Sequence, residues 1–291
     1  MSNETNSSEI DYMDMFGPIS HDSEDTKTKA KRPGELKPVT TSKRNDTVFK
    51  HLFSKKEYAV KLLKTIAKLD YTVDDIEICE TSILFQRFND LSIKVKDEYF
   101  VFVEQQSTWN PNMPLRFFIY TADIYRTFLD HPHLYSESLV PLPSPQFYII
   151  YNGKAKITED ILRLQSAFEK SKSHFLDLMA VVLDMNTVPD LPNKAKDDPL
   201  YGYTFLVNKA REYEQQGNSR DFSISQAIKD CQGSDILKDY LDSYFKEVAN
   251  MLTVERMEEL YIIGHETKGR KEGIKEGKIE GKIEGKIEGK I

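Results

Sequence analysis

The chain has 291 residues, of which 39% are hydrophobic and 30% charged, and its formal net charge is −7 at pH 7. This length suggests one large domain or two small ones, with enough apolar material for a core under a solvated surface. The negative charge argues against a protein that binds nucleic acid by bulk electrostatics, although local basic patches can still do so.

Two further features bear on the compartment. The longest purely apolar run, Leu178 to Leu183, is far below the ~18 residues that a membrane span requires, so no integral membrane protein is expected. The two cysteines cannot make a disulfide framework. We therefore expect a cytoplasmic chain.

Residues 1–44 are expected to form a disordered tail, because they are poor in aromatic side chains and rich in Ser, Thr, Asp and Lys. After an acidic opening, residues 27–44 carry seven basic side chains and a single Glu. A basic arm of this kind can bind phosphates ahead of a folded domain. The alternative interpretation is a solvated linker.

Order is predicted to begin near Asp46, where apolar residues recur at helical spacing. This spacing predicts two short helices, over Asp46–Phe53 and over Tyr58–Leu69. Ile76–Phe85 is partly strand-like. The alternation of apolar and polar residues in Leu91–Lys96 then indicates a half-buried strand.

The elements that follow alternate in type. Tyr99–Val103 is apolar throughout, as in a strand that is covered on both faces. Pro114 suits the first position of a helix, which the pattern extends over Leu115–Leu129. Phe147–Tyr151, which is followed by Asn-Gly, and Leu178–Leu183 are predicted to be strands.

From residue 200 to residue 263 the spacing is helical, with breaks near Gly217 and Gly233. The order of elements indicates an α/β protein with a mixed sheet. We expect a core over residues 45–195, a helical C-terminal extension over 196–265 and a tail over 266–291. That tail repeats Gly-Lys-Ile-Glu, in which i,i+4 pairs are like with like, so it is a weak helix at best.

The most informative residue is Glu104, which stands at the end of an apolar strand. An isolated carboxylate is costly to desolvate there, so Glu104 is expected either to pair with an Arg or Lys or to hold a metal ion. A three-residue hairpin loop over residues 96–98 would place Asp90 opposite Glu104, with Cβ atoms ~5 Å apart. Gln106 would then point to the same face, and all three would converge on one solvent-accessible cleft.

The register decides what this group can do. Two carboxylates beside a neutral polar side chain suit a hard cation such as Mg²⁺. A two-residue turn at Asp97-Glu98 would instead place the two carboxylates on opposite faces of the hairpin.

The segment Glu104-Gln-Gln-Ser-Thr-Trp-Asn-Pro-Asn-Met-Pro-Leu-Arg-Phe resembles the signature of the recombination-promoting nucleases (the Rpn family, also described as transposases). This family is a branch of the PD-(D/E)XK phosphodiesterases. The resemblance extends over residues 45–291 and includes the segments at 46–53, 147–153 and 227–241. It implies a restriction-endonuclease-like PD-(D/E)XK core and Mg²⁺-dependent cleavage of DNA.

The same resemblance assigns roles to residues. Asp90 fills the family's motif aspartate and Glu104 the glutamate of E-x-Q, and these two would hold Mg²⁺ together with the backbone carbonyl of Gln105. Gln106 would complete the catalytic group, at a position where the wider superfamily usually has Lys. Asp46 would be the acid of the first helix that assists metal binding in related folds.

Two cations are candidate DNA contacts, Arg116 and Lys94. For Arg116 the alternative is a partner role for a buried carboxylate. Trp109, the only tryptophan, is expected to be a packing lid rather than a platform on which bases stack. The preferred function is a Mg²⁺-dependent DNA endonuclease; the alternative is a nuclease-fold protein that binds DNA or a partner without turnover.

Overall fold

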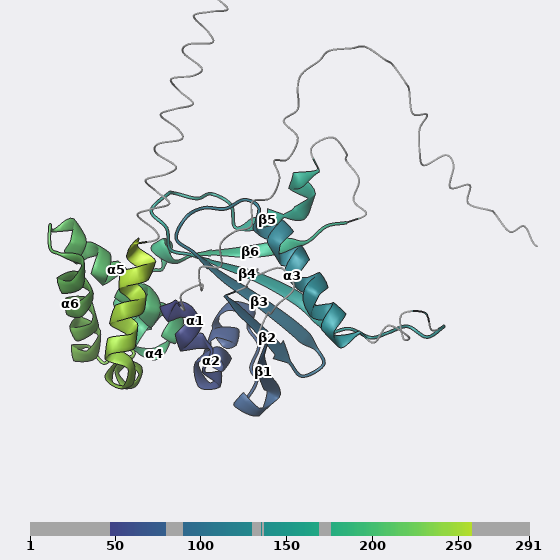
Figure 1. Ribbon diagram of the computed structural model, residues 1–291, viewed down its shortest axis with the longest axis horizontal. Coiled ribbons are helices and arrows are strands. Elements are labelled where there is room, and N and C mark those ends of the chain that lie inside the picture. The colour runs from purple at the N-terminus through teal and green to yellow at the C-terminus, as the bar shows by residue number, and fades with distance from the viewer. Residues whose placement is uncertain (1–46, 80–89, 130–134, 136, 169–175, 258–291) are drawn as a thin grey trace, which may run out of the picture. The chain divides into compact units, whose positions relative to one another are not determined.

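The computed structural model describes residues 47–79, 90–129, 135, 137–168 and 176–257 (Figure 1). All of them belong to one compact unit, Ser42–Ile291. The expected tails over residues 1–44 and 266–291 lie outside the described residues, as does Asp46. The predicted domain boundaries stay predictions.

Two helices open the described chain, as the spacing predicted. Helix α1 spans Val48–Phe53, and the Thr47 side chain accepts a hydrogen bond from the amide of Lys50 at its first turn. Helix α2 spans Lys56–Ala67 and ends at Lys68, which has a left-handed backbone conformation (φ 58°).

In the described part of the chain, six strands form one mixed sheet in the order β1-β2-β3-β4-β6-β5. β2 pairs antiparallel with β1 and β3, β5 pairs antiparallel with β6, and β3, β4 and β6 run parallel. The strands are β1 (Ile76–Cys79), β2 (Leu91–Val95), β3 (Tyr99–Gln106), β4 (Ser144–Tyr151), β5 (Ile161–Arg163) and β6 (Met179–Asp184). The predicted α/β class with a mixed sheet is therefore confirmed.

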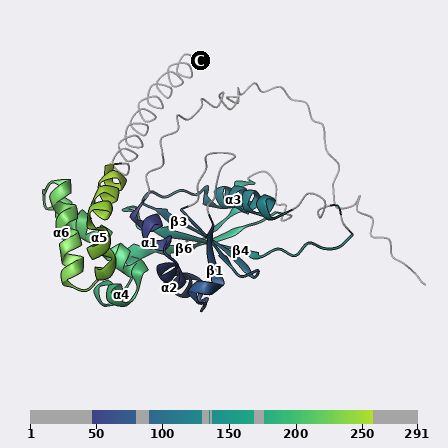
Figure 2. The same cartoon turned by 60° about the horizontal axis from the view of Figure 1, so that its bottom comes forward.

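The sheet is covered on both faces, as Figure 2 shows. Helix α3 (Met113–Phe128) packs on one face, where its apolar residues and those of β3, β4 and β6 form one hydrophobic cluster. Helices α1 and α2 cover the opposite face. Pro114 is the second residue of α3 rather than the first, and the helix begins two residues earlier than predicted.

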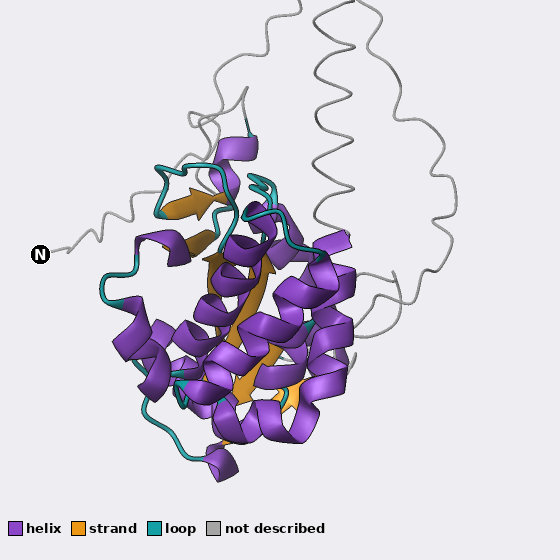
Figure 3. Ribbon diagram, turned by 90° about the vertical axis from the view of Figure 1, so that its left-hand side faces the viewer, coloured by secondary structure: helices purple, strands orange, loops and turns teal. Residues whose placement is uncertain are grey.

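The predicted helices near the C-terminal end are present as α5 (Pro199–Gln215), α6 (Arg220–Gly233) and a helical stretch over residues 238–257. A shorter helix, α4 (Leu191–Asp197), precedes them. Figure 3 shows helices in front of the strands in the view from this side. Their apolar residues join those of α1, α2 and the sheet in one cluster, which spans the predicted boundary between residues 195 and 196.

Two short elements were missed by the sequence reasoning, strand β5 and helix α4. β5 has only three residues at the edge of the sheet, too few for an alternation to be recognised. Of the segment predicted over Ile76–Phe85, the described part is strand β1.

Candidate functional site

The hairpin between β2 and β3 has the register that brings the two acidic residues together. Val95 pairs with Tyr99 and Leu91 with Val103, and residues 96–98 form the turn. Continuing this register by one residue places Asp90 opposite Glu104. The three-residue loop is therefore confirmed, and the alternative with the carboxylates on opposite faces is excluded.

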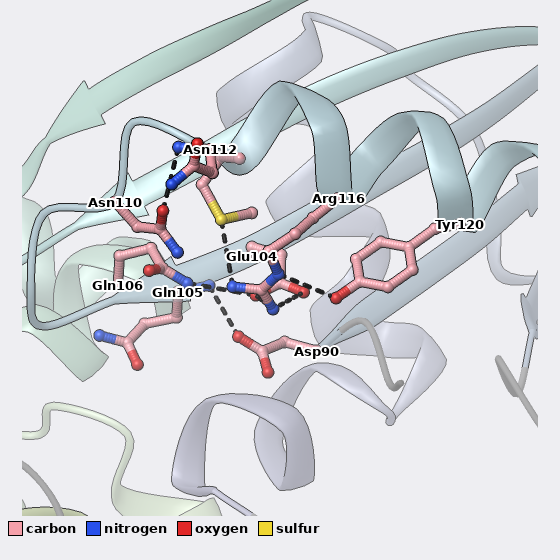
Figure 4. Close-up of polar contacts among 9 residues, drawn as sticks. Asp90, Glu104, Gln105, Gln106, Asn110, Asn112, Arg116 and Tyr120 are labelled. Carbon is pink, nitrogen blue, oxygen red and sulfur yellow. Dashed lines mark hydrogen bonds and ion pairs between the residues drawn. The ribbon is translucent and has the colours of Figure 1, made fainter. Parts of the chain in front are cut away.

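Glu104 is fully buried, on the face of the sheet that α3 covers. Both of its carboxylate oxygens lie 3.0 Å from Nη2 of Arg116, and the amide of Gln106 donates to Oε2 at 3.2 Å (Figure 4). Of the two outcomes expected for a carboxylate here, pairing with a cation is the one observed. The prediction that Glu104 lines a solvent-accessible cleft was wrong. The carboxylate is buried because α3 and its arginine cover it.

Helix α3 positions the arginine. Met113, Arg116 and Tyr120 are three and four residues apart and so lie on the same side of the helix. Nε of Arg116 donates to the Tyr120 hydroxyl at 3.0 Å, and Nη1 lies 3.2 Å from the sulfur of Met113. Burial alone lowers the pKa of Arg116, but Glu104 and Tyr120 outweigh it and raise the pKa above its ordinary value. The guanidinium is thus held as a cation.

The Asp90 side chain contacts the backbone at the end of β3. Its carboxylate accepts a hydrogen bond of 2.9 Å from the amide N–H of Gln105. Within a strand the N–H and C=O of one residue point to the same side, so the Gln105 carbonyl is directed toward the edge where Asp90 lies. The next carbonyl, that of Gln106, accepts instead from the amide of Asn152 on the other side.

The oxygen atoms of this group are of the type that binds a hard cation. Asp90, Glu104 and the Gln105 carbonyl would supply oxygen ligands, which Mg²⁺ prefers, and Figure 4 shows the side chains of Asp90, Glu104 and Arg116 around one place. Among the described residues, no three His, Cys, Asp or Glu side chains form a group that could hold a metal ion.

A second polar group, on the opposite face of β3, was missed by the sequence reasoning. The Gln105 side chain donates to Oδ1 of Asn152 at 2.7 Å, and buried Arg211 of α5 donates to the Asn152 carbonyl. Burial raises the pKa of the nearby Tyr203 hydroxyl well above its ordinary value, and the Asn152 side chain acts against this rise. This network fixes the backbone on which Glu104 and Gln106 stand.

A signal for Asn152 was present in the sequence. It directly follows an apolar strand, as Glu104 does, and only 1% of its surface is exposed. The Asn152-Gly153 pair was interpreted only as a turn. Arg211 is 59 residues away from Asn152, and no local pattern connects such positions.

The structure does not bring Lys94 into this group. Lys94 lies on the same face as Asp90 but four residues along β2, which is ~13 Å in a strand. Its ammonium lies 2.8 Å from the carboxylate of Asp97 at the hairpin. The expectation that it contacts DNA beside Arg116 has no support from this position.

Trp109 lies in the segment between β3 and α3. It meets Tyr151 edge to face, with ring centroids 5.8 Å apart, and packs against the hydrophobic cluster under α3. The packing role fits this position better than a stacking platform for bases.

A comparison with models of known protein families gave no match, and comparisons with curated proteins and with solved structures gave none either. In the described segments between residues 47 and 257, no helix has both the length and the apolar character needed to cross a membrane.

Proposed function

We propose that this chain is a Mg²⁺-dependent DNA endonuclease of the recombination-promoting nuclease type, with a PD-(D/E)XK core. One observation carries the proposal: the register of β2 and β3 pairs Leu91 with Val103, and its continuation by one residue sets Asp90 opposite Glu104. The amide hydrogen bond from Gln105 to Asp90 supports the backbone carbonyl of Gln105 as a third ligand. The sequence resemblance over residues 104–117 supplies the reaction class.

The side chains would divide the work as follows. Asp90, Glu104 and the Gln105 carbonyl would hold Mg²⁺. When bound, this ion would act as a Lewis acid that lowers the pKa of a water ligand and neutralises charge on the phosphate. Gln106 can accept and donate hydrogen bonds and so orient water, but it adds no charge. A guanidinium at position 116 suits a phosphate oxygen.

The experiment is a plasmid-nicking assay across Mg²⁺ concentrations with wild type, Asp90→Asn and Asp97→Asn. We expect Asp90→Asn to abolish nicking, because a charged ligand is lost while the shape of the side chain is kept. Asp97→Asn is the matched control, since this carboxylate lies at the turn end of the same hairpin and is exposed. Nicking that survives Asp90→Asn undiminished would refute the assignment.

A second candidate is a nuclease-fold protein that binds DNA or a partner without cleaving. The neutral Gln106 and the occupation of both Glu104 oxygens by Arg116 favour it. Gln106→Lys separates the two, since it adds the charge that is typical of the superfamily. Nicking by Gln106→Lys but not by wild type would favour the second candidate, and nicking by wild type would favour the enzyme.

A further inference from the structure

The ion pair between Arg116 and Glu104 uses only part of the guanidinium. A fork-to-fork pair between arginine and a carboxylate has two parallel N–H···O bonds from two nitrogens. Here one nitrogen, Nη2, lies 3.0 Å from both oxygens of Glu104. Nε donates to the Tyr120 hydroxyl, and Nη1 faces the sulfur of Met113, which is a weak acceptor.

The contacts of the Arg116 guanidinium are therefore of two kinds: Nε is anchored at Tyr120, and the terminal nitrogens Nη1 and Nη2 contact Met113 and Glu104. The hydrogen bond from Nε to Tyr120 lies nearest the helix, so the terminal nitrogens can leave Glu104 while this bond remains. The guanidinium also has a route to solvent, because 26% of the Arg116 side chain is exposed whereas none of Glu104 is.

The buried carboxylate of Glu104 needs one positive charge beside it. A guanidinium and a metal ion cannot both occupy all of its oxygen lone pairs. A buried carboxylate without a counter-charge is strongly disfavoured. Mg²⁺ demands near-ideal octahedral geometry with ligand oxygens about 2.0–2.1 Å away. Oε2 already accepts hydrogen bonds from Nη2 of Arg116 and from the Gln106 amide, which use its two lone pairs. A metal ion at Oε2 therefore requires one of these hydrogen bonds to be given up.

We propose that Arg116 is the counter-cation of Glu104 in the metal-free site and that a divalent cation displaces it. This inference rests on the proposed function. The freed nitrogens of Arg116, still anchored at Tyr120, then become available to a phosphate oxygen of the substrate. Arg116 thus pairs with Glu104 in the metal-free protein and with the substrate phosphate once the metal ion is bound.

The first test is Mg²⁺ binding by calorimetry to wild type, Arg116→Gln, Arg116→Lys and Arg126→Gln. Removing the competing charge should make Arg116→Gln bind Mg²⁺ at least about tenfold more tightly, given the usual strength of charged hydrogen bonds. Arg116→Lys keeps the charge and should stay close to wild type. Arg126, an exposed arginine of the same helix that pairs with Asp123, is the matched control and should leave binding unchanged.

The outcomes separate the inference from the function. Equal or weaker Mg²⁺ binding by Arg116→Gln, with clear binding by wild type, overturns the displacement and leaves the metal site standing. No Mg²⁺ binding by any of the four proteins overturns both. Tighter binding by Arg116→Gln and Arg116→Lys alike would overturn competition by charge.

A second measurement avoids reliance on a variant that loses stability. In wild type, the Nη–H resonances of Arg116 can be assigned by their absence in Arg116→Lys and followed as Mg²⁺ is added. We expect them to shift in step with binding while the Nη–H resonances of Arg126 do not move. A binding isotherm with no change at Arg116 would overturn the proposal even if Arg116→Gln fails to fold.

Discussion

The Asn152 side chain accepts a hydrogen bond from Gln105 on the face of β3 opposite Glu104. Its removal tests whether this contact stabilises the end of the strand. Asn152→Ala keeps the backbone bonds to Gln106 and Arg211 but removes the side-chain partner of Gln105. A buried polar group left without a partner costs roughly 1–3 kcal/mol. Because Gln105 is half-buried, we expect the free energy of unfolding to fall by about 1–3 kcal/mol.

Urea unfolding measures this loss, followed by the fluorescence of the single tryptophan, Trp109. With a urea slope of about 1–3 kcal/mol/M, the midpoint should fall by roughly 1 M. Asn193→Ala is the matched control: Asn193 is exposed and donates to the carboxylate of Asp190, so its loss should stay within about 0.5 kcal/mol.

A double-mutant cycle with Gln105→Ala isolates the pair. Residues in direct contact show coupling energies of about 0.5–3 kcal/mol, and we expect Gln105 and Asn152 to fall in this range. The reasoning that this network fixes the strand end is refuted in either of two cases. One is that the free energy of unfolding of Asn152→Ala lies within about 0.5 kcal/mol of that of wild type; the other is that the cycle shows no coupling.

Two further predictions concern packing and thiol chemistry. A Cβ on Gly153 would lie 2.3 Å from the backbone oxygen of Ser107, so Gly153→Ala should lower the free energy of unfolding by about 1–3 kcal/mol, whereas Gly233→Ala, with open space around it, should not. Burial raises the pKa of Cys231 to about 12, so at pH 8 only about one thiol in 10⁴ is the reactive thiolate. Thiol reagents should therefore label the partly exposed Cys79 first and Cys231 only in denaturant; equal labelling rates in the native protein would contradict this.

The sequence predicted the carboxylate pair because its geometry is local. A turn of three residues and the two-residue period of a strand are enough to set Asp90 opposite Glu104. The strands that carry most of the sheet were predicted for the same reason, since their apolar runs are visible in the chain. Strand β5 is too short to show such a pattern.

What satisfies Glu104 could not be predicted in the same way. Burial at a strand end requires a counter-charge, but whether an arginine or a metal ion provides it depends on where α3 lies against the sheet. The Asn152–Arg211 contact joins the residue that follows β4 to α5 across 59 residues. Both depend on tertiary packing, which periodicity does not encode.

The two faces of β3 therefore serve the site in different ways. On one face Gln105 is tied through Asn152 to α5, and this fixes the backbone. On the other face Glu104 accepts hydrogen bonds from Arg116 of α3 and from the side-chain amide of Gln106. A site held to within a fraction of an ångström needs a rigid support behind it. Because Gln105 alternates with Glu104 and Gln106 along β3, the backbone can stay fixed while the guanidinium on the α3 face changes its partner.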